Sequence, residues 1–347
     1  MRVTVLAGGV GGARFLRGLR EHLQVSLRDG NDGTAAHITA VVNTGDDMWL
    51  TGLRICPDLD SVMYTLAGVN DEARGWGQSG ESERVSAELA SYGVGWPWFT
   101  LGDLDLGTHI ARTHLLREGL TLSESTARLT ARWDLGVELL PMSDQPVETH
   151  VMVDDPDTVG RQTIMHFEEW WVKHRAALPV RKFVQRGLTT AVPAPGVLEA
   201  IAEADVVLLA PSNPVVSIGM IINVPGIREA ISTTAATVVG VSPIISGAAV
   251  RGMADACLTA VGVATSADAV AAHYGSRSSG GILDGWLIDE ADAGLAASIE
   301  SVGIHATVAP LWMRDAATSA SLAADALRAA RSIRSRRGEG SIRPETR

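Results

Sequence analysis

A run of glycines separates a short strand from a helix at the start of the chain. Arg2–Leu6 is an apolar, β-rich run, Gly8–Gly12 holds four glycines, and Ala13–Leu16 opens a helical pattern. Glycines let backbone N–H groups approach a phosphate closely, and the helix dipole adds about half a positive charge at that end. A tight turn without a ligand is the alternative interpretation. The glycines that we predict to bind phosphate are Gly9, Gly11 and Gly12.

Four carboxylates follow the next predicted strand and could hold a metal ion. Asp46 and Asp47 come after the apolar run Ile38–Asn43, and Asp58 and Asp60 come a short loop later. Mg²⁺ prefers a few carboxylates together with substrate phosphate oxygens, so acids beside a phosphate site indicate this ion. The alternatives are a turn at the first pair and the acidic first turn of a helix at the second pair. We favour the metal site, because acids at this place would otherwise repel the phosphate.

A second acidic stretch precedes a histidine and an arginine. Asp103 and Asp105 stand before His109 and Arg112, which have the i, i+3 spacing that places two side chains on one helix face. Such a basic face could meet an anionic substrate, or it could be solvated. Either aspartate could instead cap the helix that carries the histidine.

Polar side chains also stand where two predicted strands end. Asn43 closes the strand that begins at Ile38, and Ser212 and Asn213 follow the buried strand Asp205–Ala210. Ligands of parallel sheets bind beyond the carboxyl ends of the strands, so we expect these side chains to contact substrate. For Ser212 and Asn213 the alternative is a plain turn held by side-chain hydrogen bonds. A nucleophilic serine is not expected, since no G-x-S-x-G elbow surrounds Ser212.

The order of the predicted elements determines the expected fold class. A strand, a helix and a second strand near the N-terminus predict a right-handed βαβ unit and a parallel sheet. We therefore predict an α/β fold: a Rossmann-like, open, mostly parallel sheet with helices on both faces and an inserted α+β cap. Further strands are predicted at Ala236–Ser242, Gly281–Ile288 and His305–Val308, and helices at Gly252–Val261 and Ala316–Arg334.

The pattern changes between residues 70 and 195, and this change defines the expected domains. Residues 1–69 and 196–334 are predicted to form the nucleotide-binding core, with 70–195 as the cap and 335–347 as a disordered tail. The predicted cap includes a short strand at Val137–Leu140 and six of the nine tryptophans. Most of these rings are expected in the core of the protein, and one or two could offer a flat wall to a planar ligand.

Composition excludes several classes of protein. The 347 residues carry a net charge of −11, which argues against general nucleic-acid binding. The two cysteines, Cys56 and Cys257, are far apart, which fits a reducing cytoplasm and no zinc site. The most apolar stretch, Val206–Ile227, is interrupted by prolines and is not expected to span a membrane.

Six motifs occur in order along the chain: Ala7–Phe15, Pro57–Asp60, Arg74–Gly77, His166–Trp171, Ala210–Gly219 and Arg251–Asp255. Together they resemble the 2-phospho-L-lactate transferase family, and the match runs from Met1 to about Leu327. The Gly-Gly-Val-Gly-Gly and Glu-Trp-Trp forms are most similar to its actinobacterial branch, described as phosphoenolpyruvate transferases that make dehydro coenzyme F-420-0.

The resemblance implies a reaction and its partners. A phosphoenolpyruvyl or 2-phospho-L-lactyl group passes from its guanosine diphosphate ester to the ribityl hydroxyl of the deazaflavin 7,8-didemethyl-8-hydroxy-5-deazariboflavin (Fo), and GMP leaves. Mg²⁺ is required, the guanylyl group lies over the open sheet, and Fo lies against the insertion. The resemblance also implies a homodimer. No motif distinguishes the enolpyruvate donor from the lactate donor.

The resemblance also implies roles for individual residues. Asp46 and Asp60 would be the metal ligands and catalytic groups, with Asp60 near the Fo hydroxyl. The glycines would cradle phosphate, and Ser212 and Asn213 would contact the nucleotide. Asn43, Asp103 and His109 are also assigned to substrate binding. One position departs from the family pattern, because Leu104 stands where an arginine is usual.

Two other functions compete with the transferase. One is a non-enzymatic regulator that binds nucleotide sugars, from a related family with a similar glycine-rich start. The Trp-rich insertion and Pro57–Asp60 favour the transferase over it. The other is a nicotinamide-dependent oxidoreductase, which is disfavoured because Arg14 occupies the third glycine position of the dinucleotide fingerprint.

Overall fold

The computed structural model describes residues 1–26 and 36–339 of the chain. The loop predicted at Arg28–Ala36 therefore lies outside the described residues, apart from Ala36. The tail predicted from residue 335 is wrong over its first part, because helix α12 (Ala316–Glu339) continues to Glu339. Basic residues in its last turn favour this extension, since they complement the negative end of the helix dipole. Residues 340–347 of that predicted tail lie outside the described residues.

In the described part of the chain, seven parallel strands form the central sheet, in the order β14-β13-β10-β9-β1-β2-β5. From β1 the chain moves outward in one direction through β2 and β5, and later in the other direction from β9 to β14. The direction of winding reverses between β1 and β9, which makes this pair the topological switch point. The strands are β1 (Arg2–Ala7), β2 (His37–Val42), β5 (Glu138–Pro141), β9 (Val206–Leu209), β10 (Thr237–Val241), β13 (Gly285–Ile288) and β14 (His305–Val308).

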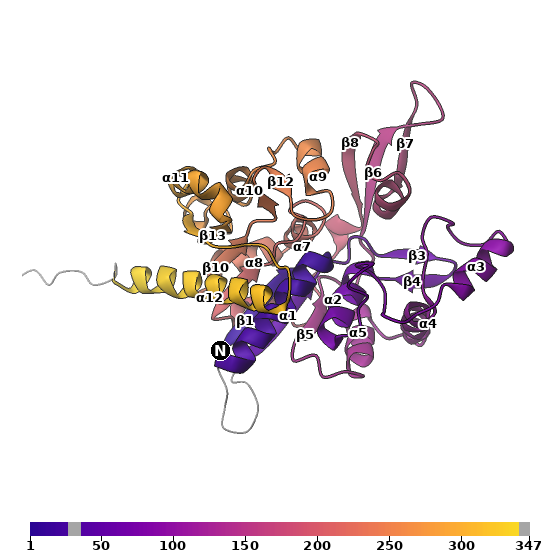
Figure 1. Ribbon diagram of the computed structural model, residues 1–347, viewed down its shortest axis with the longest axis horizontal. Coiled ribbons are helices and arrows are strands. Elements are labelled where there is room, and N and C mark those ends of the chain that lie inside the picture. The colour runs from indigo at the N-terminus through magenta and orange to yellow at the C-terminus, as the bar shows by residue number, and fades with distance from the viewer. Residues whose placement is uncertain (27–35, 340–347) are drawn as a thin grey trace, which may run out of the picture.

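Alternating strand residues face two hydrophobic cores, one on each side of the sheet. Val5 and its neighbours at every second position join one core, whereas Leu6 joins the other. The first core is covered by α1 (Gly9–Ser26), α2 (Pro57–Ala67) and α12, which lie together in Figure 1. The second is covered by α6 (Val197–Ala202), α7 (Ile218–Asn223), α8 (Ile227–Thr233), α9 (Ala254–Ala260), α10 (Ala267–Tyr274) and α11 (Ala296–Ser301). The predicted α/β class with helices on both faces is confirmed.

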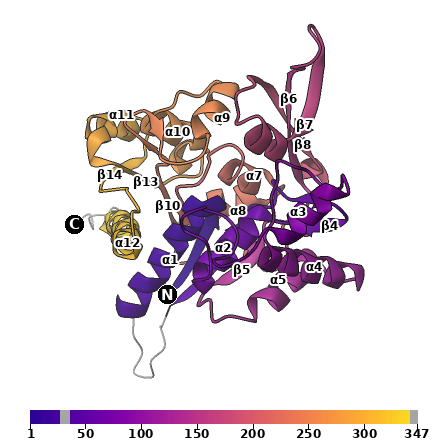
Figure 2. The ribbon, with the colours of Figure 1, turned by 45° about the vertical axis from the view of Figure 1, so that its right-hand side comes forward.

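The insertion is made of two parts, which lie on the right-hand side of the molecule in Figure 2. Helical segments α3 (Arg84–Ser91), α4 (Asp103–Arg117) and α5 (Leu122–Thr130) form the first part, beside the hairpin of β3 (Met48–Leu50) and β4 (Leu53–Ile55). The second part is an antiparallel sheet of β6 (Glu148–Asp154), β7 (Gln162–His166) and β8 (Val180–Arg186), with the short helix η1 (Glu169–Lys173).

The predicted boundary of the cap needs one correction. Strand β5 lies inside the range 70–195, yet it pairs in parallel with β2, from Thr39↔Glu138 to Val42↔Pro141. Its apolar residues Leu139 and Leu140 lie against the cores of the main sheet, so burial draws this strand out of the insertion. The cap therefore consists of two separate excursions from the sheet, on either side of β5.

Helix α12 lies directly on α1 at a glycine. A Cβ atom added at Gly18 would lie 2.3 Å from the carbonyl carbon of Ser319, so only glycine permits this approach of the two helices. The crossing closes the first core at the C-terminal end of the chain (Figure 1). Short elements complete the fold: β11 (Ile244–Ile245), β12 (Ala248–Ala249), η2 (Leu188–Thr190), η3 (Arg277–Ser279) and η4 (Glu290–Leu295). Among the described residues, no helix is both long enough and apolar enough to cross a membrane.

Candidate active site

A cavity of about 430 Å³ opens at the carboxyl ends of the strands, over the switch point between β1 and β9. Its walls come from the start of α1, the turns after β2, β9 and β10, the segment after β14, and the insertion. This is the place where open α/β sheets bind ligands. The lining residues used below are Gly9, Gly11, Arg14, Asp46, Asp58, Phe167, Trp171, Ser212, Asn213, Arg251, Trp312 and Arg314.

The glycine run serves close packing as well as the cavity. Helix α1 begins at Gly9, which has a positive φ of 59°. A Cβ atom at Gly11 would lie 2.7 Å from the Pro211 carbonyl oxygen, and one at Gly12 would lie 2.8 Å from Ser212 Oγ. The bare backbone therefore lets α1 pack onto the turn that follows β9. Gly9 and Gly11 line the cavity, whereas Gly12 lies behind them against the strands.

Ser212 and Asn213 hold the turn after β9 in place. Ser212 Oγ accepts a hydrogen bond from the Gly8 N–H (3.0 Å) and donates one to the Gly8 carbonyl (2.7 Å), which ties the end of β9 to the end of β1. Asn213 Oδ1 accepts from the N–H groups of Val215 (2.9 Å) and Val216 (3.2 Å). Both side chains therefore have the structural role that the sequence left open, although both also face the cavity.

Asp46 and Asp58 face the cavity and are bridged by one amide. Asn43 Nδ2 donates to Asp58 Oδ2 at 2.8 Å and to Asp46 Oδ2 at 3.2 Å, so Asn43 supports the pair from below. Burial raises the pKa of Asp58 to about 6. Burial, then the charges of Asp58 and Glu168, raise the pKa of Asp46 well above its usual range. Two carboxylates that repel each other in a buried place favour either protons or a cation.

Glu168 and Asp47 belong to the same buried region but have different surroundings. Glu168 comes from the insertion, and burial, then the charge of Asp58, raise its pKa to about 8. Burial likewise raises the pKa of Asp47 to about 6, although the Arg54 guanidinium lies 3.1 Å from its Oδ2 and opposes the shift. Among the described residues, Asp46 Oδ1 and Asp47 Oδ1 are both buried without a hydrogen-bond partner, but only Asp47 is compensated by an ion pair, with Arg54.

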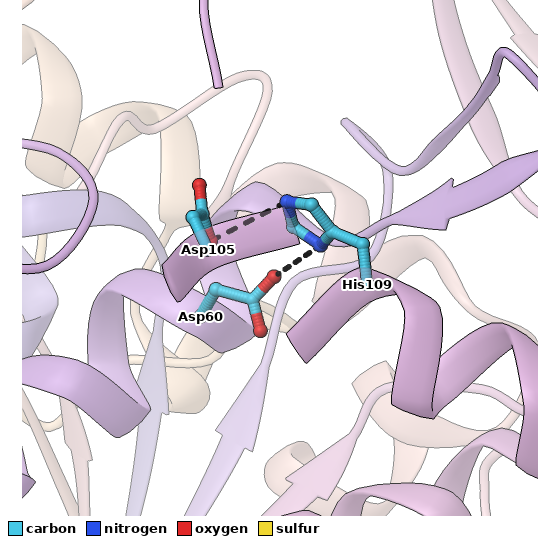
Figure 3. A group of neighbouring side chains, drawn as sticks. All are labelled: Asp60, Asp105 and His109. Carbon is cyan, nitrogen blue, oxygen red and sulfur yellow. Dashed lines mark ion pairs between the residues drawn. The ribbon is translucent and has the colours of Figure 1, made fainter. Parts of the chain in front are cut away.

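Asp60 lies in a separate buried network, between α2 and α4 (Figure 3). Arg112 donates to both carboxylate oxygens, through Nη1 to Oδ2 at 3.0 Å and through Nη2 to Oδ1. His109 Nδ1 lies 3.5 Å from Asp60 Oδ2, and its Nε2 lies 3.3 Å from Asp105 Oδ1. The Tyr64 hydroxyl donates to the same Asp105 oxygen at 2.8 Å. The predicted shared face of His109 and Arg112 is thus buried and paired with acids.

The charges within this network set its protonation. Burial raises the pKa of Asp60, even though Arg112 and His109 oppose the shift. Burial would raise the pKa of Asp105. The hydrogen bond with His109 and the charge of His109 outweigh burial, so this pKa lies below its usual value. Burial would lower the pKa of Arg112, but the Asp60 carboxylate raises it. The guanidinium is therefore a fixed positive charge beside Asp60.

Two places in the structure could hold a metal ion. Asp60, Asp105 and His109 each offer a ligand atom, and these atoms lie within 4.8 Å of one another. However, Arg112 already occupies both oxygens of Asp60, and its positive charge opposes a cation there. The pair Asp46 and Asp58 faces the cavity, and in the described residues it has no such positive partner.

Asp103 joins two segments of the insertion outside the cavity. Its Oδ1 accepts from the N–H groups of Ser82 and Leu104, both at 2.9 Å, and its Oδ2 accepts from Ser82 Oγ at 2.8 Å. These hydrogen bonds hold its pKa below the usual value. The described residues that line the cavity do not include Asp60, Asp103 or His109. The predicted contact of these three residues with substrate therefore has no direct support.

A match to a family model decides between the candidate functions. The model of "2-phospho-L-lactate transferase CofD" matches residues 3–309. The chain belongs to this family. It is therefore an enzyme that transfers a phosphate-containing group in the biosynthesis of coenzyme F-420, and the resemblance seen in the sequence motifs is confirmed. The binding regulator and the nicotinamide-dependent oxidoreductase are set aside.

Curated relatives of this transferase cover almost its whole length. A "phosphoenolpyruvate transferase" of Mycobacterium sp. (strain JLS) is 54% identical over 325 residues, which are 93% of this chain and 96% of the relative. The protein of the same name from Streptomyces griseus is 53% identical over 96% of this chain and 100% of its own. Among solved structures, a protein of the UPF0052 family from Bacillus halodurans has a TM-score of 0.59 at 18% identity. It covers 94% of this chain and 100% of its own, and this likeness shows the shared fold.

The transferase cavity also contains residues that were not assigned from the sequence. Arg14, Arg251 and Arg314 line it, as do the aromatic rings of Phe167, Trp171 and Trp312. Arg14, Arg251 and Trp171 lie inside motifs that support the family resemblance. Their position in these motifs could have identified them as candidate site residues from the sequence. Arg314 and Trp312 gave no signal, because they reach the cavity only through the position of β14 at the sheet edge.

Proposed function

We propose that this transferase moves a phosphoenolpyruvyl group, or a 2-phospho-L-lactyl group, from its guanosine diphosphate ester to Fo. The ribityl hydroxyl oxygen forms a bond to the distal phosphorus, and the bond from that phosphorus to the bridging oxygen breaks. GMP leaves with the electron pair, and the hydroxyl proton passes to a base. The products are GMP and coenzyme F-420-0 or its dehydro form. The name of the relatives favours the enolpyruvyl donor.

The observation that carries this proposal is the composition of the single cavity over the switch point. It combines two buried acids, three arginines and the start of α1 with exposed faces of Trp171 and Trp312. Phosphoryl transfer depends on positioning and on charge neutralisation more than on covalent chemistry. Arginines and helix N–H groups suit the phosphates of the donor. The two rings suit the planar guanine and deazaflavin, and Trp171 supports the placement of Fo against the insertion.

We propose Mg²⁺ as the ion of this site, with Asp46 and Asp58 as its ligands from the chain. The orphan Oδ1 of Asp46, and the carboxylate repulsion that raises both pKa values, fit a hard divalent cation. When bound, Mg²⁺ would neutralise the negative charge that develops on the transferred phosphate. Asp46 thus keeps the metal and catalytic roles expected from the sequence.

For Asp60 the geometry supports a positioning role in place of metal ligation. Asp58 and Asp60 are two residues apart in the first turn of α2, so their side chains point to different sides of the helix. Asp58 faces the cavity, whereas Asp60 holds Arg112 of α4. We propose that this ion pair fixes the start of α2, and with it the direction of Asp58.

The metal proposal can be tested by magnesium titration of activity. Asp46→Asn and Asp58→Asn are expected to abolish turnover or to raise the Mg²⁺ concentration for half-maximal activity by at least tenfold. Asp60→Asn is expected to leave that concentration within about twofold, whatever its effect on the rate. The reverse pattern would return the metal to the group of Asp60, Asp105 and His109.

The transferase reaction itself is tested by a mass-spectrometric turnover assay. Fo, Mg²⁺ and the two guanylylated donors, offered in competition, are expected to give GMP together with one (dehydro) F-420-0 product. The product that dominates names the donor, and EDTA should abolish it. Failure to form either product with demonstrable Fo binding would contradict the proposed donors. The homodimer and the cytoplasmic location stay predictions, and light scattering on the purified protein checks the first.

A further inference from the structure

Two arginines line the cavity, and among the described residues neither has an acidic partner. Arg14 stands in the second turn of α1, and Arg251 stands in the segment between β12 and α9; both line the cavity. Burial, and then the positive charge of Arg14, lower the pKa of Arg251. Among residues 1–26 and 36–339, neither guanidinium forms an ion pair with a carboxylate.

One acid that feels the charge of Arg14 is already engaged with another arginine. Glu72 feels the charge of Arg14, but its Oε1 accepts a hydrogen bond from Arg17 Nη1 at 2.6 Å. Two neighbouring positive charges cost free energy, and the protein as a whole carries a net charge of −11 that could have supplied a partner. Placing these two arginines at one cavity therefore does not stabilise the folded protein by itself. An anionic ligand that binds between them would remove the cost of their repulsion.

The position of Arg251 is fixed by a glycine of the insertion. Gly75 has a positive φ of 82°, and a Cβ atom there would lie 2.1 Å from Arg251 Nη2. The loop around it is closed by the bridge between Asn70 and Gln78 and by hydrogen bonds from Arg74 to Asp71. This loop of the insertion thus lies directly against the Arg251 guanidinium, in the space that the missing Cβ of Gly75 leaves open.

The helix places Arg14 in line with the cavity-lining glycines. Gly11 and Arg14 are three residues apart, so they share one face of α1. An anion bound at the start of this helix would therefore contact the backbone N–H groups of the first turn and the Arg14 guanidinium of the next turn. Guanidinium groups bind phosphate oxygens in pairs of parallel hydrogen bonds, so two guanidiniums that line one cavity suit two linked phosphates.

We propose that Arg14 and Arg251 form a clamp for the diphosphate of the nucleotide donor, and that Gly75 makes the room that sets the position of Arg251. This inference rests on the proposed function, and it names the residues that recognise the two linked phosphates. The clamp distinguishes a nucleoside diphosphate from a monophosphate, so it holds the donor and releases GMP after transfer.

Calorimetric titration with GDP and with GMP, in the presence of Mg²⁺, tests the clamp. Arg14→Gln and Arg251→Gln are each expected to weaken GDP binding by about 10- to 100-fold, the range for lost hydrogen bonds to charged groups. At least one of the two variants should leave GMP binding within about threefold of the parent value, because GMP lacks the second phosphate that this guanidinium would hold. Gly75→Ala should also weaken GDP binding, because it displaces Arg251. The matched control is Arg181→Gln, whose guanidinium pairs with Asp154 on the surface of the insertion.

Thermal unfolding of the ligand-free variants separates binding from structure. Since each glutamine removes a like-charge repulsion, the midpoints of Arg14→Gln and Arg251→Gln should equal or exceed that of the parent protein. A lowered midpoint in both variants would overturn the clamp in favour of a structural role. Equal GDP affinity in these variants and in Arg181→Gln would also overturn it. If the parent protein binds no GDP at all, both the proposed function and the clamp are overturned, whereas GDP binding that neither substitution weakens overturns the clamp alone.

Discussion

At the scale of residues, Asp58 and Asp60 show how two acids of one helix turn acquire different tasks. Both are buried in the first turn of α2, yet in the part of the chain that the structure describes only Asp60 has a cationic partner, Arg112. Asp58 shares the Asn43 amide with Asp46 and faces the cavity. A buried carboxylate that is paired stabilises a contact between helices, whereas an uncompensated one is ready for a ligand.

Removal of Asp60 should destabilise the protein through its partner. Asp60→Ala leaves Arg112 buried without a counter-charge, so the free energy of unfolding is expected to fall by about 3–5 kcal/mol. Urea denaturation measures the loss.

A second substitution identifies the cause of this loss. Asp60→Ala with Arg112→Met removes both charges of the pair, so the double variant should recover most of the stability. If Asp60→Ala unfolds at the same urea concentration as the parent protein, the ion pair has no structural role.

The pKa of Glu168 predicts a pH dependence of stability in metal-free protein. Because burial raises this pKa to about 8, the folded state holds the proton more tightly than the unfolded chain does. The resulting penalty is absent below about pH 4.3, grows as pH rises, and is complete above about pH 8. Glu168→Gln removes it, so the variant should match the parent at pH 4 and be more stable at pH 9. Denaturation series in EDTA check this, and parallel curves would contradict it.

At the scale of elements, glycines decide how closely the helices approach their neighbours. Gly11 and Gly12 let α1 pack onto the turn after β9, and Gly18 lets α12 cross α1. These contacts explain why the glycine pattern of α1 fits the dinucleotide fingerprint poorly. Three of its glycines are required because a side chain there would collide with a neighbouring segment. The pattern still marks the right place, because the same close packing opens the cavity beside Gly9.

Two glycine-to-alanine substitutions should have opposite effects on stability. Gly18→Ala forces the backbone of α12 away and should lower the free energy of unfolding by about 1–3 kcal/mol. Gly107→Ala, on the exposed face of α4 with open space around its Cβ position, should raise it by about 0.5–1 kcal/mol. Chemical denaturation of both variants measures the difference, and a loss at Gly107 equal to that at Gly18 would refute the packing explanation.

Elements with a strong local signal could be predicted from the sequence, and contacts between distant segments could not. β14 is predicted within its observed bounds, and Pro57 marks the start of α2, because apolar runs and caps are local. The pairing of β5 with β2 and of Arg112 with Asp60 joins segments that lie far apart in the chain. For the same reason the sequence could not predict that Asp46 lies beside Asp58. The sequence analysis had paired Asp46 with Asp60 instead.

At the scale of the whole molecule, the second part of the insertion shares a core with the sheet. Val151, Phe167 and Trp170 of the insertion belong to the same buried cluster as Leu6 and Val207 of the central strands. The first part has its own small cluster, which includes Met48 and Leu101. The insertion is thus no independent domain, and its second part and the sheet depend on each other.

A single unfolding transition is expected from this shared core. Scanning calorimetry should show one cooperative peak for the sheet together with β6, β7 and β8, whereas two resolved peaks would contradict the shared core. Hydrogen exchange should show a gradient within that unit. Helix α3, in which no residue of the described range Arg84–Ser91 is buried, should exchange much faster than α1.

The path of the chain has a consequence for how this enzyme is made in the cell. Arg14 and Arg314 line one cavity, and α12 must lie on α1 before the first core is closed. They are separated by roughly 300 residues, so at about 5–20 residues per second the ribosome needs about 15–60 s between them. During that time the nascent chain carries the glycine-rich start without the segments that complete the site. The nucleotide site is therefore complete only after the last segment of the sheet has been made, and the face of α1 that later receives α12 stays uncovered for that time.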